Sequence, residues 1–80
     1  MSVLPAQCRA ARALIDMGQA TLARRAVVRR DALADFENGS RMLSPDNFAA
    51  IRAALEAAGV IFIDENVEGP GVRLWKKHGL

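Results

Sequence analysis

The sequence has few of the residue types on which catalytic and metal sites depend. It contains one cysteine, one histidine and no tyrosine among its 80 residues. The single cysteine, Cys8, cannot form an internal disulfide, and no Cys/His cluster has the spacing of a zinc site. We expect Cys8 to be a small core residue rather than a nucleophile. The sequence also has no Ser/His/Asp set and no glycine-rich phosphate loop, so we expect no enzyme, metal site or cofactor.

Long apolar runs are missing as well. No stretch approaches about 18 apolar residues, and the N-terminus, MSVLPAQCR, has no basic region followed by an apolar one. We therefore expect a cytoplasmic protein without membrane contact. A chain of 80 residues forms one domain and buries only ~60% of its unfolded surface, which favours oligomerisation as added stabilisation.

Charge is unevenly distributed along the chain, although the net charge is only +2. Residues 1–30 hold six arginines against one acid, Asp16, whereas residues 31–72 hold two arginines against eight acids. This distribution gives the molecule a basic end suited to phosphates. Ordinary solvated charge on helix faces would explain the same pattern.

Apolar spacing and turn residues predict the secondary structure. Pro5 suits the first turn of a helix that we expect over 5–16. Ser44, as an N-cap before Pro45, begins a further helix over 44–58 that Gly59 ends. Beyond residue 60 the runs VIFIDE and GVRLW, separated by NVEGPG, have the composition of a β-hairpin. The chain is thus predicted to be mainly α, with four to five helices in a domain over 1–59 and a C-terminal hairpin extension over 60–80.

The stretch 19–37 predicts two short helices joined by a tight turn. The inward positions follow helical spacing and are Leu22, Ala23, Ala26, Leu33, Phe36 and Glu37. The remaining face of the second helix carries Arg29, Arg30, Asp31 and Asp35. This arrangement indicates a helix-turn-helix, although any helical hairpin in a small bundle can show it.

The same stretch resembles the Cro/C1 (XRE, lambda-repressor-like) DNA-binding family. The resemblance rests on Gln19-x-x-Leu22-Ala23-x-x-Ala26-x-Val28, followed by Leu33-x-x-Phe36-Glu37-Asn38-Gly39, and covers roughly residues 5–59. It implies a lambda-repressor-like bundle of four to five helices and an ion pair between Arg12 and Glu37. Two residues depart from the family pattern, because Val27 replaces a glycine of the turn and Arg29 replaces a Ser or Thr helix cap. Both changes affect the angle at which the second helix is presented.

The resemblance also implies a DNA-contacting surface, with the recognition helix over 28–37 in the major groove. Arg30 would bond guanine O6 and N7, while Asp31 and Asp35 would accept from cytosine N4. The residues implied to contact phosphates are Gln19, Arg29, Asn38, Ser40 and Arg41. The residues alone also allow a plainer interpretation, in which the two aspartates are solvated charges and 38–40 is only a helix stop.

We expect the hairpin to make or support a homodimer, because one recognition helix reads too few base pairs for useful specificity. Apolar residues lie on both faces of its strands, more than one small core should absorb. The residues assigned to this contact are Ile61, Ile63, Val72, Leu74 and Trp75. Trp75 could equally cover the core.

The function implied by the resemblance is a transcriptional regulator that binds operator DNA as a homodimer. The simplest form is a repressor or controller of its own promoter, of the kind that often accompanies mobile elements. The chain has no room for a sensing domain, so we expect no small-molecule ligand. The alternative is a protein-binding helix-turn-helix that acts as an antiactivator or antitoxin, which the two acids on the second helix and the altered turn would suit.

Overall fold

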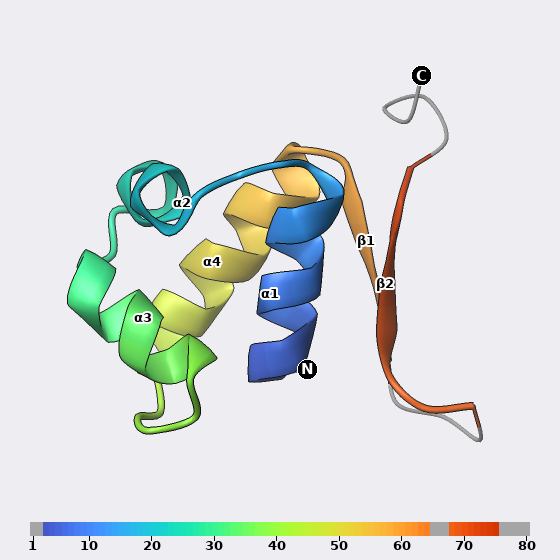
Figure 1. The fold of residues 1–80 in the computed structure, drawn as a ribbon. Helices are drawn as coiled ribbons and strands as arrows, with labels where there is room; N and C mark the ends of the chain where they lie inside the picture. The colour runs from blue at the N-terminus through green and yellow to red at the C-terminus, as the bar shows by residue number, and fades with distance from the viewer. Residues whose placement is uncertain (1–2, 65–67, 76–80) are drawn as a thin grey trace.

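The structure, a computed structural model, describes residues 3–64 and 68–75. This part of the chain forms four helices and a two-stranded antiparallel hairpin, whose arrangement can be followed in Figure 1. The elements are α1 (Pro5–Leu14), α2 (Gln19–Ala26), α3 (Arg30–Glu37), α4 (Pro45–Ala57), β1 (Val60–Ile63) and β2 (Gly71–Leu74). The prediction of a mainly helical chain with a C-terminal hairpin is therefore confirmed.

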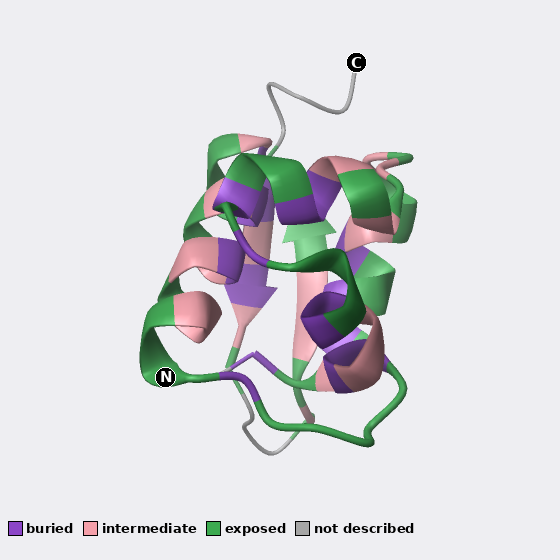
Figure 2. Ribbon diagram, turned by 90° about the vertical axis from the view of Figure 1, so that its left-hand side faces the viewer, coloured by how far each residue is buried: buried purple, intermediate pink, exposed green. Residues whose placement is uncertain are grey.

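The elements surround one hydrophobic core. α2 and α3 form one side of the molecule, the hairpin forms the opposite side, and α1 and α4 lie between them (Figure 1). α1 and α4 contact the hairpin, and α2 packs on α4. The buried residues of the helices face this interior, as Figure 2 shows. The largest fully buried apolar side chains are those of Phe36, Leu22, Leu33, Ile51 and Leu55.

α1 ends earlier than its apolar spacing predicts. Its last helical residue is Leu14, and Asp16 adopts a left-handed conformation with φ of 53°. The Met17 N–H then donates to the Arg12 carbonyl over 2.9 Å and closes the helix end. Ile15 packs against the core although it lies beyond the last helical residue, so the apolar spacing continues past the end of the helix. The predicted range of 5–16 was therefore too long.

The turn between α2 and α3 contains a strained residue. Val27 has φ of 56° and ψ of 48°, a left-handed conformation that costs a residue with a side chain roughly 1–2 kcal/mol. Its side chain is 89% exposed, whereas Val28 is buried. Arg29 is extended, and its side chain makes no capping hydrogen bond. α3 therefore begins at Arg30, and the predicted range of 28–37 was too long at its start.

α4 begins as its sequence predicts. The Ser44 hydroxyl oxygen accepts from the Asn47 N–H over 3.2 Å, and Pro45 occupies the first helical turn. Phe48 is half-buried, and its ring meets that of Phe36 edge to face, with the centroids 5.2 Å apart. This contact fixes the start of α4 against the end of α3.

The hairpin belongs to the same core as the helices. Its register places Val60 opposite Leu74 and Phe62 opposite Val72. These residues share one face of the hairpin, where Val60 and Phe62 are buried and Val72 packs against the core. The guanidinium of Arg52 on α4 lies over the Phe62 ring, 5.0 Å from its centroid. Packing on the helices stabilises a two-stranded hairpin that would be marginal alone.

Gln7 ties α1 to both strands. Its side chain is buried, and Nε2 donates to the carbonyl oxygens of Ile63 at 3.1 Å and Gly71 at 3.0 Å. Its Oε1 accepts from the Leu4 N–H over 2.9 Å, which satisfies an amide at the start of the helix. One buried side chain thus bonds a helix end and the two strands.

We predict that Gln7→Ala lowers the free energy of unfolding by about 2 kcal/mol, because two strand carbonyls and one amide each lose a hydrogen bond. Urea denaturation measures this loss, and hydrogen exchange should show the hairpin amides losing protection before those of α4. Gln7→Glu is the matched control, since it keeps the acceptor for Leu4 but removes the donor. A Glu variant as stable as the wild type at neutral pH would contradict the role of Nε2.

Candidate functional site

The carboxylate of Glu37, the last residue of α3, is the centre of a buried polar cluster. Glu37 is 2% exposed. Arg12 on α1 binds both carboxylate oxygens, with Nη2 2.6 Å from Oε1 and Nε 2.7 Å from Oε2. The Cys8 thiol donates to Oε2 over 3.0 Å, and Gln19 Nε2 donates to Oε1 over 2.8 Å. The ion pair between Arg12 and Glu37 is therefore present, and the cluster joins α1, α2 and α3.

Two arginines of α1 also bond backbone carbonyls next to this cluster. Arg9 Nη1 donates to the Glu37 carbonyl, and Arg12 Nη1 donates to the Met17 carbonyl over 3.1 Å. The Glu37 carbonyl lies at the C-terminal end of α3, where a cation offsets the partial negative charge of the helix. The end of α3 is thus held through both its side chain and its backbone.

Burial and hydrogen bonding act in opposite directions on Glu37. Burial alone would raise its pKa, but hydrogen bonds from Arg12, Cys8 and Gln19 outweigh that effect and hold the pKa below its ordinary value. Burial, together with the bond to Glu37, raises the pKa of the Cys8 thiol far above its usual range. Cys8 is accordingly a protonated donor in the core and not a nucleophile.

The outer surface of α2, α3 and the loop after α3 is rich in arginine. The exposed arginines of these segments are Arg24, Arg25, Arg29, Arg30 and Arg41, of which Arg25 lines a hollow with Asp16 and the end of α4. Within residues 3–64 and 68–75, Arg30 forms no ion pair. A surface of this composition attracts anions and offers donors to their oxygen atoms.

Arg29 and Asp31 form a two-bond ion pair at the start of α3. Arg29 Nε lies 3.1 Å from Asp31 Oδ1, and Nη2 lies 2.9 Å from Oδ2. Oδ1 also accepts from the Ala32 N–H over 2.8 Å, so Asp31 satisfies a helix-end amide that Arg29 cannot cap. The hydrogen bond from Arg29 lowers the pKa of Asp31 and keeps it ionised.

The loop after α3 brings four of the predicted contact residues together. Ser40 Oγ donates to Asn38 Oδ1 over 2.6 Å, and the Ser40 N–H donates to the Asp35 carbonyl over 2.9 Å. Gly39 takes the positive φ, 84°, that ends the helix. Arg41 Nη1 lies 3.9 Å from Asp35 Oδ2, an exposed and loose ion pair. These residues form the helix stop that the sequence predicts.

Gln19, for which the resemblance implies a phosphate contact, donates one hydrogen bond inward to Glu37. Its side chain is half-buried at the start of α2. A glutamine amide has two N–H groups, and the bond to Glu37 uses one of them. The second N–H remains for an acceptor outside the cluster.

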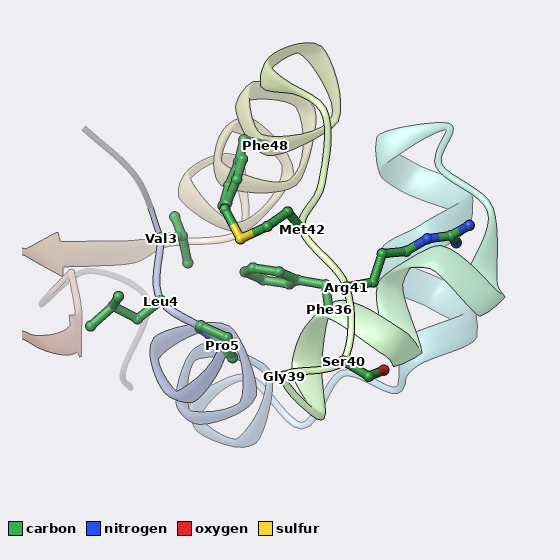
Figure 3. A pocket seen from close by; sticks show the side chains of 9 residues that line it. All are labelled: Val3, Leu4, Pro5, Phe36, Gly39, Ser40, Arg41, Met42 and Phe48. Carbon is green, nitrogen blue, oxygen red and sulfur yellow. The ribbon is translucent and has the colours of Figure 1, made fainter.

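An apolar hollow of about 260 Å³ lies between the start of α1, the end of α3 and the loop that leads to α4 (Figure 3). Phe36, Phe48 and Met42 point into the same space, and Met42 is 77% exposed. The other described lining residues are Val3, Leu4, Pro5, Gly39, Ser40 and Arg41. Of the described lining only Arg41 is ionisable, so the hollow offers contact area rather than acid–base chemistry.

The five residues predicted to make a dimer contact do not lie on a single face of the hairpin. Its register places Val72 and Leu74 on the face with the buried Val60, so this pair is half-buried toward the helices. Ile61 and Ile63 lie on the opposite face and are also half-buried, and Trp75, which follows β2, is 48% exposed. The assigned residues are therefore partly accessible on both faces of the hairpin, and the outer face carries Ile61 and Ile63 beside the exposed Arg73.

Gln7, Arg9 and the Cys8 thiol make polar contacts although the sequence analysis assigned no polar contact to any of them. A glutamine three residues after a helix cap is a recognisable signal for the bond to Leu4. The strand carbonyls that Gln7 binds lie 56 and 64 positions away along the chain, so no local pattern marks them.

Comparison with models of known protein families finds no match, and a search of curated proteins finds none. None of the helices in the described part of the chain is long and apolar enough to span a membrane. In the same residues, no three His, Cys, Asp or Glu side chains are grouped as metal ligands would be. The described features of the site are the exposed arginines of α2, α3 and the following loop, and the buried Glu37 cluster.

We predict that Glu37→Gln makes folding less sensitive to acid. The lowered pKa of Glu37 stabilises the wild-type fold above about pH 4, and this contribution is lost as the pH falls through the folded-state value. The variant should be less stable near neutral pH, because Arg12 loses its ionic partner, but should lose less stability between about pH 5 and pH 2. Urea denaturation across this range measures both effects.

Glu56→Gln is the control for this prediction. Glu56 lies on the exposed side of α4, where it pairs with Arg52 over 3.1 Å. Its replacement should leave the pH dependence of unfolding close to that of the wild type. An equal pH dependence in Glu37→Gln and the wild type would contradict the lowered pKa.

Proposed function

We propose that this protein is a sequence-specific DNA-binding regulator of the lambda-repressor-like type. In this proposal α2 and α3 act as a helix-turn-helix, and α3 enters the major groove. The observation that carries it is the arginine-rich outer surface of α2 and α3, supported from within by the Glu37 cluster. Guanidinium groups near a helix start suit both phosphate oxygens and the edge of guanine.

The position of α3 supports this proposal. An α-helix with its side chains is about 10–12 Å wide, close to the width of the major groove. α3 lies on the side of the molecule away from the hairpin (Figure 1), so a duplex approaching it meets α2 and α3 first. Its inner residues Leu33, Phe36 and Glu37 are buried, which leaves the polar outer face for contacts.

The proposed roles follow from exposure and pairing. Arg30 is exposed and forms no ion pair within the described residues, so it is the proposed reader of a guanine. Asp35 is the proposed acceptor for cytosine N4. The residues proposed to contact the phosphate backbone are Gln19, Asn38, Ser40 and Arg41.

The proposed regulator acts as a homodimer through the outer face of the hairpin. Ile61 and Ile63 are the apolar residues of this face, beside the exposed Arg73, and a two-fold contact would bury them. The hairpin lies opposite α3 (Figure 1), so two chains joined there keep both α3 helices uncovered. Recognition of two half-sites on one duplex then requires that the two-fold axis bring both α3 helices to the same side of the dimer, about 34 Å apart.

A protein-binding helix-turn-helix, acting as an antiactivator or antitoxin, is the second candidate. One observation favours it: both acids of the α3 outer face are paired, Asp31 with Arg29 and Asp35 with Arg41. This pairing reduces the positive charge available to phosphates. The exposed arginines still outnumber these acids, which favours DNA as the partner.

The test of the proposed function is an electrophoretic mobility shift with duplex DNA from upstream of the protein's own gene, compared with a random duplex of equal length. The upstream duplex should bind preferentially, and binding should weaken steeply with salt because phosphate contacts release counterions. If neither duplex shifts at low salt, DNA binding is rejected, and isolation of a specific protein complex would then support the second candidate.

We predict that Arg30→Ala costs about 1–3 kcal/mol of discrimination at one base position of each half-site, because a bidentate guanine contact is lost. Competition between the upstream duplex and single-base variants measures this effect. Arg24→Ala is the control, since Arg24 is exposed on α2 and its loss should weaken binding to both duplexes alike. Parallel losses in the two variants would reject the base-reading role of Arg30.

We predict that Ile61→Lys shifts the protein from dimer to monomer, because it replaces an apolar contact by a second positive charge directly opposite Arg73 on the outer face of the hairpin. Sedimentation equilibrium measures the mass, and the same variant should bind the upstream duplex less tightly. Ala49→Lys, an exposed change on α4, is the control and should stay dimeric. An Ile61→Lys protein that stays dimeric would reject the hairpin as the interface.

A further inference from the structure

The ion pair between Arg29 and Asp31 depends on the shape of the turn before α3. Residues two positions apart on an α-helix do not face each other. Arg29, however, lies just outside the helix in an extended conformation with φ of −64° and ψ of 137°. Its side chain can therefore reach back to Asp31, and two hydrogen bonds join them.

Asp31 is itself fixed to the helix. Its Oδ1 accepts from the Ala32 N–H over 2.8 Å, in addition to the bond from Arg29 Nε. The backbone amide thus holds the carboxylate, and the carboxylate holds the guanidinium. Both side chains stay accessible, with exposed fractions of 83% for Arg29 and 60% for Asp31.

The edge of the guanidinium that Asp31 occupies determines which donors remain. An arginine has five N–H donors in a planar fork. Asp31 uses the edge formed by Nε and one N–H of Nη2. The adjacent edge, formed by Nη1 and the second N–H of Nη2, makes no hydrogen bond with the described residues. That edge presents two parallel donors, which match the O6 and N7 acceptors of guanine.

A phosphate is the less suitable partner for this arrangement. Asp31 largely neutralises Arg29 and places a negative charge next to any phosphate that Arg29 would bind. The edge of a guanine carries acceptors but no net charge, so the same carboxylate repels it far less. Restricting Arg29 before binding also reduces the side-chain entropy lost in the complex.

We propose that Asp31 is a positioning residue that holds Arg29 so that Arg29 reads a guanine in the major groove. The inference rests on the proposed function, and it changes two roles implied by the resemblance. Arg29 reads a base rather than a phosphate, and Asp31 orients Arg29 rather than accepting from cytosine. The start of α3 then offers two neighbouring base-reading arginines, Arg29 and Arg30.

The test is selection from a pool of randomised duplex DNA by the wild type, Asp31→Asn, Arg29→Lys and Asp46→Asn. Asp46 is the matched control, because it is an acid in the first turn of α4 as Asp31 is in α3. The wild type and Asp46→Asn should select a guanine at one position. The preference of Asp31→Asn for guanine at that position should be lower by a factor of about ten or more. Arg29→Lys keeps the positive charge but lacks the two parallel N–H donors of the guanidinium, and it should lose the same preference for guanine.

Affinity for random duplex separates positioning from a general structural role. It should be unchanged or higher in Asp31→Asn, because an acid has been removed near the phosphates. Replacing the selected guanine by 7-deazaguanine, which lacks N7, should weaken binding by the wild type but have little further effect on Asp31→Asn. These results together would support the inference.

Other results overturn it. If Asp31→Asn keeps the wild-type base preference, the inference fails while DNA binding stands. If wild-type binding is insensitive to 7-deazaguanine but is lost when the selected cytosine carries an N4-methyl group, Asp31 is the cytosine acceptor and the inference fails. If the wild type retains no duplex from the pool, the proposed function fails and the inference fails with it.

Discussion

The arrangement of the first three helices depends on the buried, ionised carboxylate of Glu37. Such a group is stable in a core only when its oxygens are satisfied, which here requires donors from Arg12, Cys8 and Gln19. Apolar contacts alone tolerate small shifts between helices, because they have no direction. The bonds to Glu37 do have direction, so α1 and α2 cannot move relative to the end of α3 without leaving a charge unpaired.

Local rules were enough to place the helices but not their ends. The capping residues before α4 and the inward spacing of α2 and α3 predicted those elements from short stretches of sequence. The errors lie at the end of α1 and the start of α3. Asp16 adopts a left-handed conformation although it is not a glycine, and Val27 does so at the position where the family resemblance implies a glycine. Such a residue costs energy that the packing around it offsets, and a sequence contains no signal for that compensation.

For the candidate site, too, the sequence predicted some features and not others. Helical spacing predicted which side of α3 is exposed and identified Glu37 as an inward residue, whereas the pairing of Glu37 with Arg12 was implied by the family resemblance. The pairing of Arg29 with Asp31 depends on the extended backbone of Arg29, and the inward turn of Gln19 depends on the position of the buried carboxylate. Gln7 is the extreme case, because its partners become neighbours only when the hairpin has formed.

The polar contacts that hold α3 lie at its C-terminal end, so a tilt of the helix displaces mainly its N-terminal end. Its eight residues span about 12 Å, with Glu37 as the pivot and Arg30 at the far end. A tilt of about 10° about the pivot displaces the far end by roughly 2 Å, more than a bidentate hydrogen bond tolerates. The packing of the buried Val28 and Ala32, near the N-terminal end, therefore determines the direction in which α3 points. Adding or removing a methyl group at either position would redirect the arginines while leaving the exposed face of α3 chemically unchanged.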